Sequence, residues 1–331
     1  MNGLPEGACR AARSPLERRL TVLLPAWAVG KALEPLWEDW LDGAGGWLLQ
    51  GRPLDDLLGF PPQGPLPWAA LARRGLGLHG RGHWLLGTPL HLSPKGTGLD
   101  WEVAAPEAGE MEALAADVNR HFGAWGWRLE PAPGAAVWFL GFDAPTGLRT
   151  RPPFHPGRGD APWLPAGEEA AGWRVRLNEL QMFLHEHPVN RAREEAGRPP
   201  VNGLWPWGEG TLAPGQGRPW AAVGGDDPVL GGLAALAGRP CLSPRELLGR
   251  IAGTGAAGGG DYLLGWGAPL WAAGTARPEA VAGELLPGLE AALGGLDRLV
   301  LCSTSGTGYY LMVRHGPARV LKRWWRSIRS R

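Results

Sequence analysis

The sequence predicts an α/β protein with a mostly parallel sheet and helices on both of its faces. Apolar runs of strand length alternate along the chain with stretches whose apolar residues recur at helical spacing. The 331 residues are 44% hydrophobic, enough for one large domain with an insertion or for two modest domains. Because 53 glycines and 33 prolines are spread among these apolar runs, we expect a loop-rich globular chain.

The first expected strand is the apolar run at 20–24, which Pro25 ends. Two arginines before this run and the AWA sequence at 26–28 also imitate a signal peptide. We favour the buried strand because residues 1–17, which read as a disordered tail, precede it. No apolar run reaches the roughly 18 residues that a membrane span requires.

The elements expected after this strand alternate up to residue 142. A helix is expected at 111–126, where Met111, Leu114, Val118 and Phe122 recur at helical spacing and a glycine follows. The other segments of this half are a short amphipathic helix at 32–43, apolar stretches at 54–60 and 67–78, an extended stretch at 84–92 and a strand at 135–142.

The second half begins with a stretch rich in proline, glycine and arginine at 146–171, which reads as a linker or a long surface loop. A helix follows at 173–187, and Pro188 ends it. The series is completed by segments at 220–225, 231–238 and 261–267, a helix at 279–293 and a strand at 297–304.

Charge and cysteine content narrow the class of protein. The formal net charge is +1, so no global field favours nucleic acid as a partner. Cys9, Cys241 and Cys302 are odd in number and widely spaced, which suggests neither a disulfide framework nor a CxxC metal site. We therefore expect a protein of the reducing cytoplasm that has no cofactor and contacts neither a membrane nor nucleic acid.

A candidate binding site lies in the stretch HEHPVNRAREEAGRPPVNGLWPWGEG at 185–210. A helix is expected to begin after HPVN, with Asn190 as its N-cap and Gly197 just past its end. The side chains of Asn190, Arg191, Arg193 and Asn202 then offer directed donors beside a helix N-terminus, which suits an anion. The alternative is that they serve only capping and turns. His185 and His187 are two residues apart and would point to different helix faces, so no metal pair is expected.

The same stretch carries a resemblance to a known family. The pattern HPVN-x-x-R, a short helix that ends in glycine, and VN-x-LWPWG-x-G resembles the archaeal-type, 2,3-bisphosphoglycerate-independent phosphoglycerate mutases. Weaker similarities follow in the same order along the chain, at LLGFPP, PLHLSP, AAVWFLGF, AAVGGDDPVLGGLAALAG and LDRLVLCSTSG. The wording LNELQMFLHEHPVN and the chain length resemble more closely the bacterial proteins called RpfE-type regulatory proteins.

The resemblance implies an alkaline-phosphatase-like fold, a doubly wound, mostly parallel sheet with a small inserted α+β subdomain. It implies a core at 18–85 and 150–318, an insertion at 86–149 and a basic tail at 319–331. That tail, VLKRWWRSIRSR in its full extent, could touch a membrane or nucleic acid, although docking of a tryptophan on the core is the commoner outcome.

In the mutases two metal ions, held by Asp and His at the carboxyl ends of the strands, serve a serine nucleophile. This chain departs from that pattern at four places. It has Pro25-Ala26-Trp27 in place of Asp-Gly-Met, and it has no serine between 47 and 60. It lacks the late Asp-x-x-x-His near 265–276 and has Cys302-Ser303-Thr304-Ser305 in place of Asp-His.

No replacement for this catalytic set is evident in the sequence. Asp226 and Asp227 read as loop or N-cap residues, Cys302 reads as buried and inert, and no His–Asp pair can be assigned to Ser303 or its neighbours. We therefore predict no catalytic residues and no metal ligands.

We expect a catalytically degenerate, phosphoglycerate mutase-like protein with a regulatory or ligand-binding role. An active phosphotransfer enzyme with a remodelled site is the alternative. The expected ligand is a small phosphorylated or carboxylated molecule that lies in a crevice at the sheet's carboxyl edge, and a protein partner is possible. The candidate ligand contacts are His187, Asn190, Arg191 and Asn202, with Arg191 as the principal charge.

Overall fold

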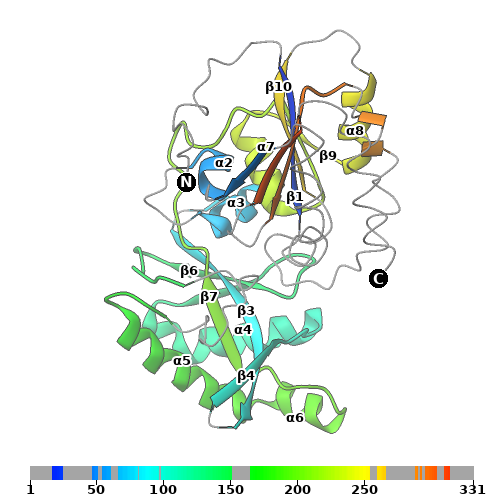
Figure 1. Ribbon diagram of the computed structural model, residues 1–331. Helices are drawn as coiled ribbons and strands as arrows, with labels where there is room; N and C mark the ends of the chain where they lie inside the picture. The colour runs from blue at the N-terminus through cyan, green and yellow to red at the C-terminus, as the bar shows by residue number, and fades with distance from the viewer. Residues whose placement is uncertain are drawn as a thin grey trace, which may run out of the picture.

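The computed structural model describes residues 17–24, 47–50, 54–60, 66–80, 82–96, 98–150, 165–253, 259–265, 288–289, 291–292, 295–303 and 309–313. These residues form two layers, each with its own sheet and helices (Figure 1). A seven-stranded sheet carries the larger layer, and a five-stranded sheet carries the second. The α/β prediction is confirmed.

The seven-stranded sheet has the order β2-β12-β11-β1-β10-β8-β9. The five strands from β11 to β9 are parallel, and β12 and β2 add an antiparallel edge. The predicted first strand is confirmed as β1, which hydrogen-bonds to a neighbour on each side. The strands are β1 (Arg18–Leu24), β2 (Trp47–Gln50), β8 (Ala222–Gly224), β9 (Cys241–Leu242), β10 (Gly260–Gly265), β11 (Arg298–Ser303) and β12 (Tyr309–Val313).

Helices cover both faces of this sheet. On one face Val223 and Leu263 pack in a single core with the helices α2 (Leu54–Leu58), α3 (Trp68–Gly75) and α7 (Pro228–Leu236). Neighbouring strand residues point the opposite way, and a methyl group on Gly224 would lie 2.8 Å from Leu247 of α8 (Pro244–Gly253). The prediction of helices on both faces is therefore confirmed.

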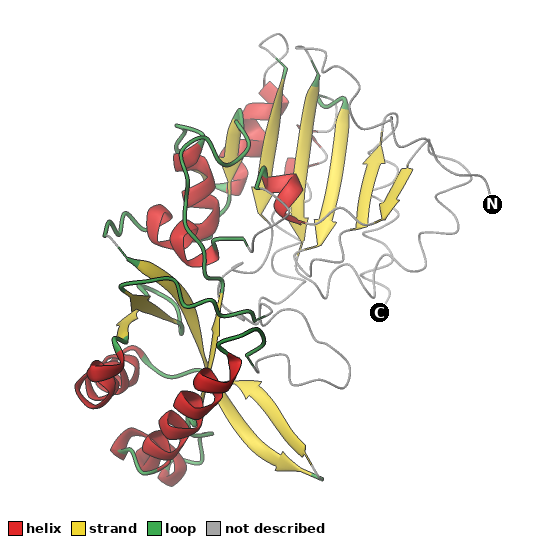
Figure 2. Cartoon of the chain, turned by 90° about the vertical axis from the view of Figure 1, so that its left-hand side faces the viewer, coloured by secondary structure: helices red, strands yellow, loops and turns green. Residues whose placement is uncertain are grey.

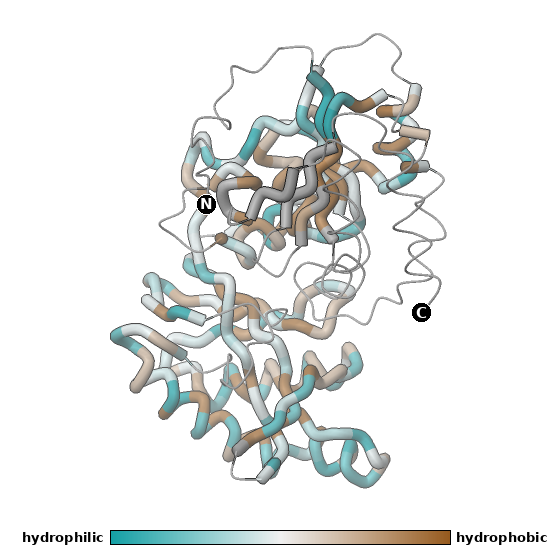
Figure 3. Tube along the Cα trace, in the orientation of Figure 1, coloured by the Kyte–Doolittle hydropathy of each residue, from teal (hydrophilic) through white to brown (hydrophobic). Residues whose placement is uncertain are grey.

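The strands of this sheet change in polarity along their length, from hydrophilic at their amino ends to hydrophobic beyond (Figure 3). Arg19 and Asp261 form an ion pair of 2.5 Å at the amino ends of β1 and β10. The apolar part of the strands therefore lies between the helix layers and leads to the carboxyl ends.

The helices α3 and α7 pack so closely that only glycine fits at their contact. A methyl group on Gly75 would lie 1.9 Å from the Pro228 carbonyl oxygen, and one on Gly232 would lie 2.1 Å from that of Leu71. Because these obstacles are backbone atoms, no side-chain movement could make room. The glycine-rich sequence of α7 is thus a packing requirement.

The second sheet is antiparallel throughout, in the order β4-β3-β6-β5 with β7 also paired to β3. One of its faces shares the core with α3, and the other carries two long helices, α4 and α5. Figure 2 shows the two sheets as separate layers of the molecule. The elements are β3 (His83–Lys95), β4 (Gly98–Val103), α4 (Ala108–Phe122), the 3-10 turn η1 (Gly123–Trp125), β5 (Arg128–Pro131), β6 (Trp138–Phe142), α5 (Ala170–His185), α6 (Pro188–Glu195) and β7 (Gly203–Trp207).

This second layer is longer in sequence than the insertion expected at 86–149. It begins with β3 and includes β7, which pairs with β3 over residues 86–90. Residues of α5 pack in the same core as α4, away from the seven-stranded sheet. The difference arises because β3 is long enough to pair with β4, β6 and β7 along its length.

The individual elements predicted at 84–92, 111–126, 135–142 and 173–187 are confirmed as β3, α4, β6 and α5. The helix predicted at 32–43, residues 1–16 of the predicted disordered tail and the predicted basic tail lie outside the described residues, as does most of the helix predicted at 279–293. No helix in the described ranges is long and apolar enough to cross a membrane.

Candidate functional site

The carboxyl ends of the parallel strands meet at one edge of the seven-stranded sheet, and Figure 2 shows this edge turned toward the second sheet. The pairing sets Leu24 of β1 beside Ser303 of β11, and Leu23 beside Gly265 of β10. β8 continues through α7 outward to β9, whereas the next described strand after β10 is β11, on the other side of β1. The direction of the connections thus reverses between β8 and β10, which is the place where open α/β sheets commonly bind ligands.

Two carboxylates follow β8 at this edge. Asp227 is 8% exposed, and its carboxylate Oδ1 accepts the backbone N–H of Val229 at 2.7 Å, so it is the N-cap of α7. This confirms the interpretation of Asp227 as a capping residue. Asp226 is exposed. Of the pair, Asp226 therefore has the carboxylate that is open to solvent.

Two cysteine thiols near this edge have pKa values above their usual range. Partial burial, with the Asp226 and Asp227 carboxylates, raises the pKa of the Cys241 thiol to about 11. Burial raises the pKa of the Cys302 thiol to about 12, and its side chain is fully buried, as the sequence predicts. Both thiols are thus protonated and weakly nucleophilic.

Among the described residues, the donor set at this edge does not fit two metal ions. Across the described residues, no group of three or more His, Cys, Asp or Glu side chains could hold a metal ion. The turn after β8 supplies Asp226 and Asp227, and the second of these caps a helix. We therefore derive no catalytic step through a metal centre for this chain.

The stretch at 185–210 lies in the second layer. Its helix α6 is at the far end of the molecule from the seven-stranded sheet, and its strand β7 pairs with β3 (Figure 1). The expectation that this stretch lines a crevice at the carboxyl edge of the large sheet is therefore wrong for α6. The physical reason is the pairing of β7, which holds α6 and β7 in the second layer, whereas Gly208 after β7 accepts the Ala69 N–H of α3 at 3.2 Å.

Asn190 is not the N-cap of α6, as the sequence analysis expected, but lies inside the helix and is 1% exposed. Its side-chain amide donates to the carbonyl oxygens of Leu184 at 2.7 Å and Val201 at 2.8 Å, and its Oδ1 accepts the Val201 N–H at 2.7 Å. Asn190 thereby joins the end of α5 to the segment that leads into β7. The expected position of Gly197 just past the helix is confirmed.

His187 is the N-cap of α6 and is 5% exposed. Its Nδ1 accepts the backbone N–H of Val189 at 3.2 Å, so its Nε2 carries the proton that faces Asp117 at 3.0 Å. Burial lowers the pKa of His187, which favours the neutral ring that this cap requires.

Asn202 and the arginines complete the block. Asn202 bonds the backbone of Leu92 twice, accepting its N–H at 2.6 Å and donating to its carbonyl oxygen at 2.9 Å. The pattern HPVN-x-x-R ends on Arg193, which is 3% exposed and pairs with Glu110 at 2.6 Å. Arg191, named in the sequence analysis as the principal charge, is exposed on the surface of α6. Anion binding by this block stays a prediction.

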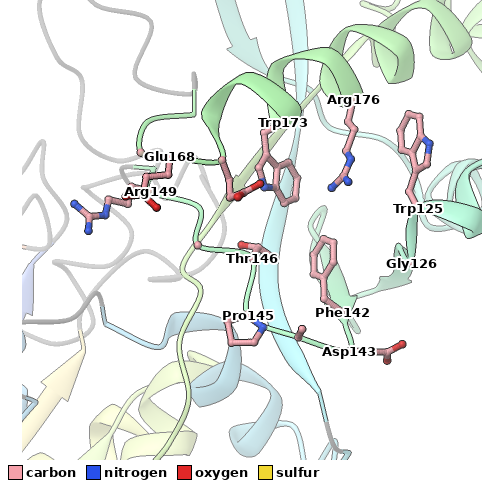
Figure 4. Close-up of a pocket in the computed structure, with 14 residues that line it drawn as sticks. Trp125, Gly126, Phe142, Asp143, Pro145, Thr146, Arg149, Glu168, Trp173 and Arg176 are labelled. Carbon is pink, nitrogen blue, oxygen red and sulfur yellow. The ribbon is translucent and has the colours of Figure 1, made fainter.

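A pocket that the sequence analysis did not predict opens beside α5. It has a volume of about 810 Å³ and includes Trp125, Phe142, Trp173 and Arg176 in its lining (Figure 4). Part of the lining, Thr146, Gly147, Arg149 and 167–169, comes from the stretch at 146–171 that reads as a linker or surface loop. Trp125 and Phe142 are far in sequence from Trp173 and Arg176, so no local pattern indicates the pocket.

Comparison with known proteins finds short stretches of related sequence. Over 49 residues the chain is 37% identical to a 2,3-bisphosphoglycerate-independent phosphoglycerate mutase of Methanosarcina barkeri, and this match covers 15% of this chain and 12% of that protein. Over 47 residues it is 43% identical to a probable enzyme of the same name from Geobacter sulfurreducens, which covers 14% and 12%. The matched segment thus spans about an eighth of each relative, and no family model matches the chain.

Two solved structures are also similar. One is a cofactor-independent phosphoglycerate mutase from Thermoplasma acidophilum, with a TM-score of 0.39, 16% identity and coverage of 90% of this chain and 89% of that one. The other is a protein from Pyrococcus horikoshii, with a TM-score of 0.48, 13% identity and coverage of 92% and 89%. The sequence matches relate one segment of this α/β chain to the 2,3-bisphosphoglycerate-independent phosphoglycerate mutases.

Proposed function

We propose that this protein is an alkaline-phosphatase-like, phosphoglycerate mutase-like binding protein that does not catalyse the mutase reaction and has a regulatory role in the cytoplasm. The observation that carries the proposal is the set of residues that follow the adjoining strand ends. The pairing of β1 with β10 and β11 brings these ends together. In the sequence Pro25-Ala26-Trp27 follows β1 and Thr304-Ser305 follows β11, with no carboxylate or imidazole among them.

A two-metal phosphotransfer site needs several anionic or imidazole ligands, because two divalent ions a few ångströms apart must both be neutralised. At these ends the described part of the chain offers Asp226 and Asp227, and Asp227 is already engaged by the N-terminus of α7. One free carboxylate does not balance that charge. This argues against the mutase reaction and for a role in binding.

The regulatory part of the proposal rests on the resemblance to RpfE-type proteins at LNELQMFLHEHPVN. The ligand proposed on the same ground is a small phosphorylated or carboxylated molecule, and a protein partner is a further possibility. His187, Asn190 and Asn202 already have backbone or side-chain partners within the fold. Of the four candidate ligand contacts, Arg191 is thus the one whose charge faces solvent.

The alternative is a phosphotransfer or phosphatase-type enzyme with a remodelled site. Asp226 favours it, because this exposed carboxylate follows β8, where the direction of the strand connections reverses. Hydroxyl groups of Ser303, Thr304 and Ser305 follow the nearby end of β11 in the sequence. A single acidic residue with a hydroxyl nucleophile would be the minimal form of such a site.

Metal content and turnover separate the two functions. Protein purified without chelators should contain much less than one equivalent of metal by mass spectrometry. It should convert no 3-phosphoglycerate in an enolase-coupled assay with Mg²⁺, Mn²⁺ or Zn²⁺, with an active phosphoglycerate mutase as positive control. Turnover by the parent protein that Asp226→Asn abolishes would overturn the proposal and establish the alternative.

A further inference from the structure

The pocket beside α5 is separate from the carboxyl edge of the large sheet. It opens where the end of β6 and the loop after it meet η1 and the first turns of α5 (Figure 4). Its volume of about 810 Å³ is within the range of small-molecule sites. None of the residues that line it belongs to the parallel strands.

Three aromatic side chains in the lining of the pocket are held in place by packing. Trp173 is 2% exposed and stacks on Trp127 with ring centroids 5.4 Å apart. Phe142 meets Trp173 edge to face at 5.6 Å, and the half-buried Trp125 meets Trp127 in the same way at 5.3 Å. Because these rings brace one another, the pocket is preformed and suits a flat apolar group.

Arg176 supplies a positive charge beside these rings. Figure 4 shows its half-buried side chain directed into the space between Trp125, Phe142 and Trp173. In the described part of the chain it has no hydrogen-bond, ion-pair or ring partner, whereas Arg174 on the same helix donates to the Pro165 carbonyl oxygen at 3.1 Å. The five N–H donors of Arg176 are thus open to a ligand, and their planar fork matches a carboxylate.

The rim limits the charge of the ligand. Asp143, Glu168 and Glu169 are exposed carboxylates of the lining, and Arg149 is the second arginine. The Asp143 carboxylate pairs with Arg128 at 3.0 Å. The other two acidic side chains, Glu168 and Glu169, disfavour a ligand with several negative charges, such as a phosphate ester. A cation would instead have to approach the Arg176 guanidinium. The ligand that satisfies both conditions has one negative charge.

We propose that this pocket binds a small, planar monocarboxylate, with the carboxylate on Arg176 and the flat group against Trp125. The inference assigns a ligand class to a second place in the fold. It stands whether or not the carboxyl edge of the large sheet has catalytic activity, so its failure and the failure of the proposed function are distinguishable.

A set of probes with one ring and different charges tests this proposal in the full-length protein. 2-Naphthoate should bind with a dissociation constant of about 10 μM to 1 mM by calorimetry and saturation-transfer NMR. The neutral 2-naphthamide and the dianionic 2-naphthyl phosphate should bind at least tenfold more weakly. Arg176→Gln should weaken 2-naphthoate at least tenfold, and Trp125→Leu should weaken it several-fold.

The matched control is Arg245→Gln, which removes an exposed arginine of α8 and should leave 2-naphthoate binding unchanged. The proposal is overturned if 2-naphthoate does not bind, or if both Arg176→Gln and Trp125→Leu bind it as tightly as the parent protein. It is equally overturned if 2-naphthyl phosphate or a naphthyl trimethylammonium ion binds more tightly. Loss of binding in Arg245→Gln alone would place the site on α8 and also refute it.

Discussion

Asn190→Ala should destabilise the fold strongly, whereas Arg191→Ala, one residue away, should not. The Asn190 side chain makes three hydrogen bonds of 2.7–2.8 Å to backbone groups and is 1% exposed. At about 1 kcal/mol for each bond, their loss costs about 3 kcal/mol. The cost rises further because the Val201 N–H and carbonyl oxygen lose the partner that Asn190 provides.

Arg191 is exposed, so its removal should change the free energy of unfolding by no more than about 0.5 kcal/mol. Thermal unfolding followed by circular dichroism should therefore show a drop in Tm of about 6 °C or more for Asn190→Ala and almost none for Arg191→Ala. Urea unfolding of the same proteins provides an independent measure. If the Tm of Asn190→Ala equals that of the parent protein, or if the Tm of Arg191→Ala drops by as much as that of Asn190→Ala, then Asn190 does not anchor this block.

Further predictions concern close packing, thiol chemistry and pH. Gly232→Ala should lower Tm by several degrees, because the added methyl would lie 2.1 Å from a helix carbonyl oxygen, whereas Gly249→Ala, with nothing within 4 Å, should raise it slightly. Because its pKa is about 11, Cys241 should react slowly with iodoacetamide at pH 8, as measured by peptide mapping with mass spectrometry. Asp226→Asn should speed this reaction, because it removes a negative charge that raises the pKa of the thiol. An unchanged rate would contradict this electrostatic effect. Because burial lowers the pKa of His187, the unfolded chain binds a proton at this ring more tightly than the folded chain does. The contribution of the neutral His187 to the free energy of unfolding should therefore be fully present above pH 6.5 and should decrease as the pH drops below that value. His187→Gln should flatten this part of a stability–pH profile, and an equally steep profile would exclude His187 as its source.

Much of the fold could be predicted from local pattern. The alternating elements, the first strand and the helices on both faces were confirmed because each depends on the spacing of apolar residues along one segment. The role of Asp227 as a cap was also predictable from local sequence, because an acidic residue before Pro228 is a signal for a helix start.

The candidate site was predicted less well. The sequence shows that HPVN, NG and WPWG form a dense polar and aromatic block, but a local pattern does not reveal what each side chain contacts. Asn190 looked like a cap because Asn is favoured there, yet His187 fills that position. The bonds of Asn190 to Val201 and of Asn202 to Leu92 join residues 11 and 110 positions apart.

The sequence by itself determined the α/β class, the order of the elements and the residue types at the strand ends, because these depend on composition and short-range periodicity. Only the tertiary structure decided that residues 203–207 belong to the second sheet, since β3 can hydrogen-bond to strands that enter from distant parts of the chain. It also decided that Trp125, Phe142, Trp173 and Arg176 line one pocket. Their proximity follows from the packing of α5 against α4 and β6, which the sequence of a single segment does not encode.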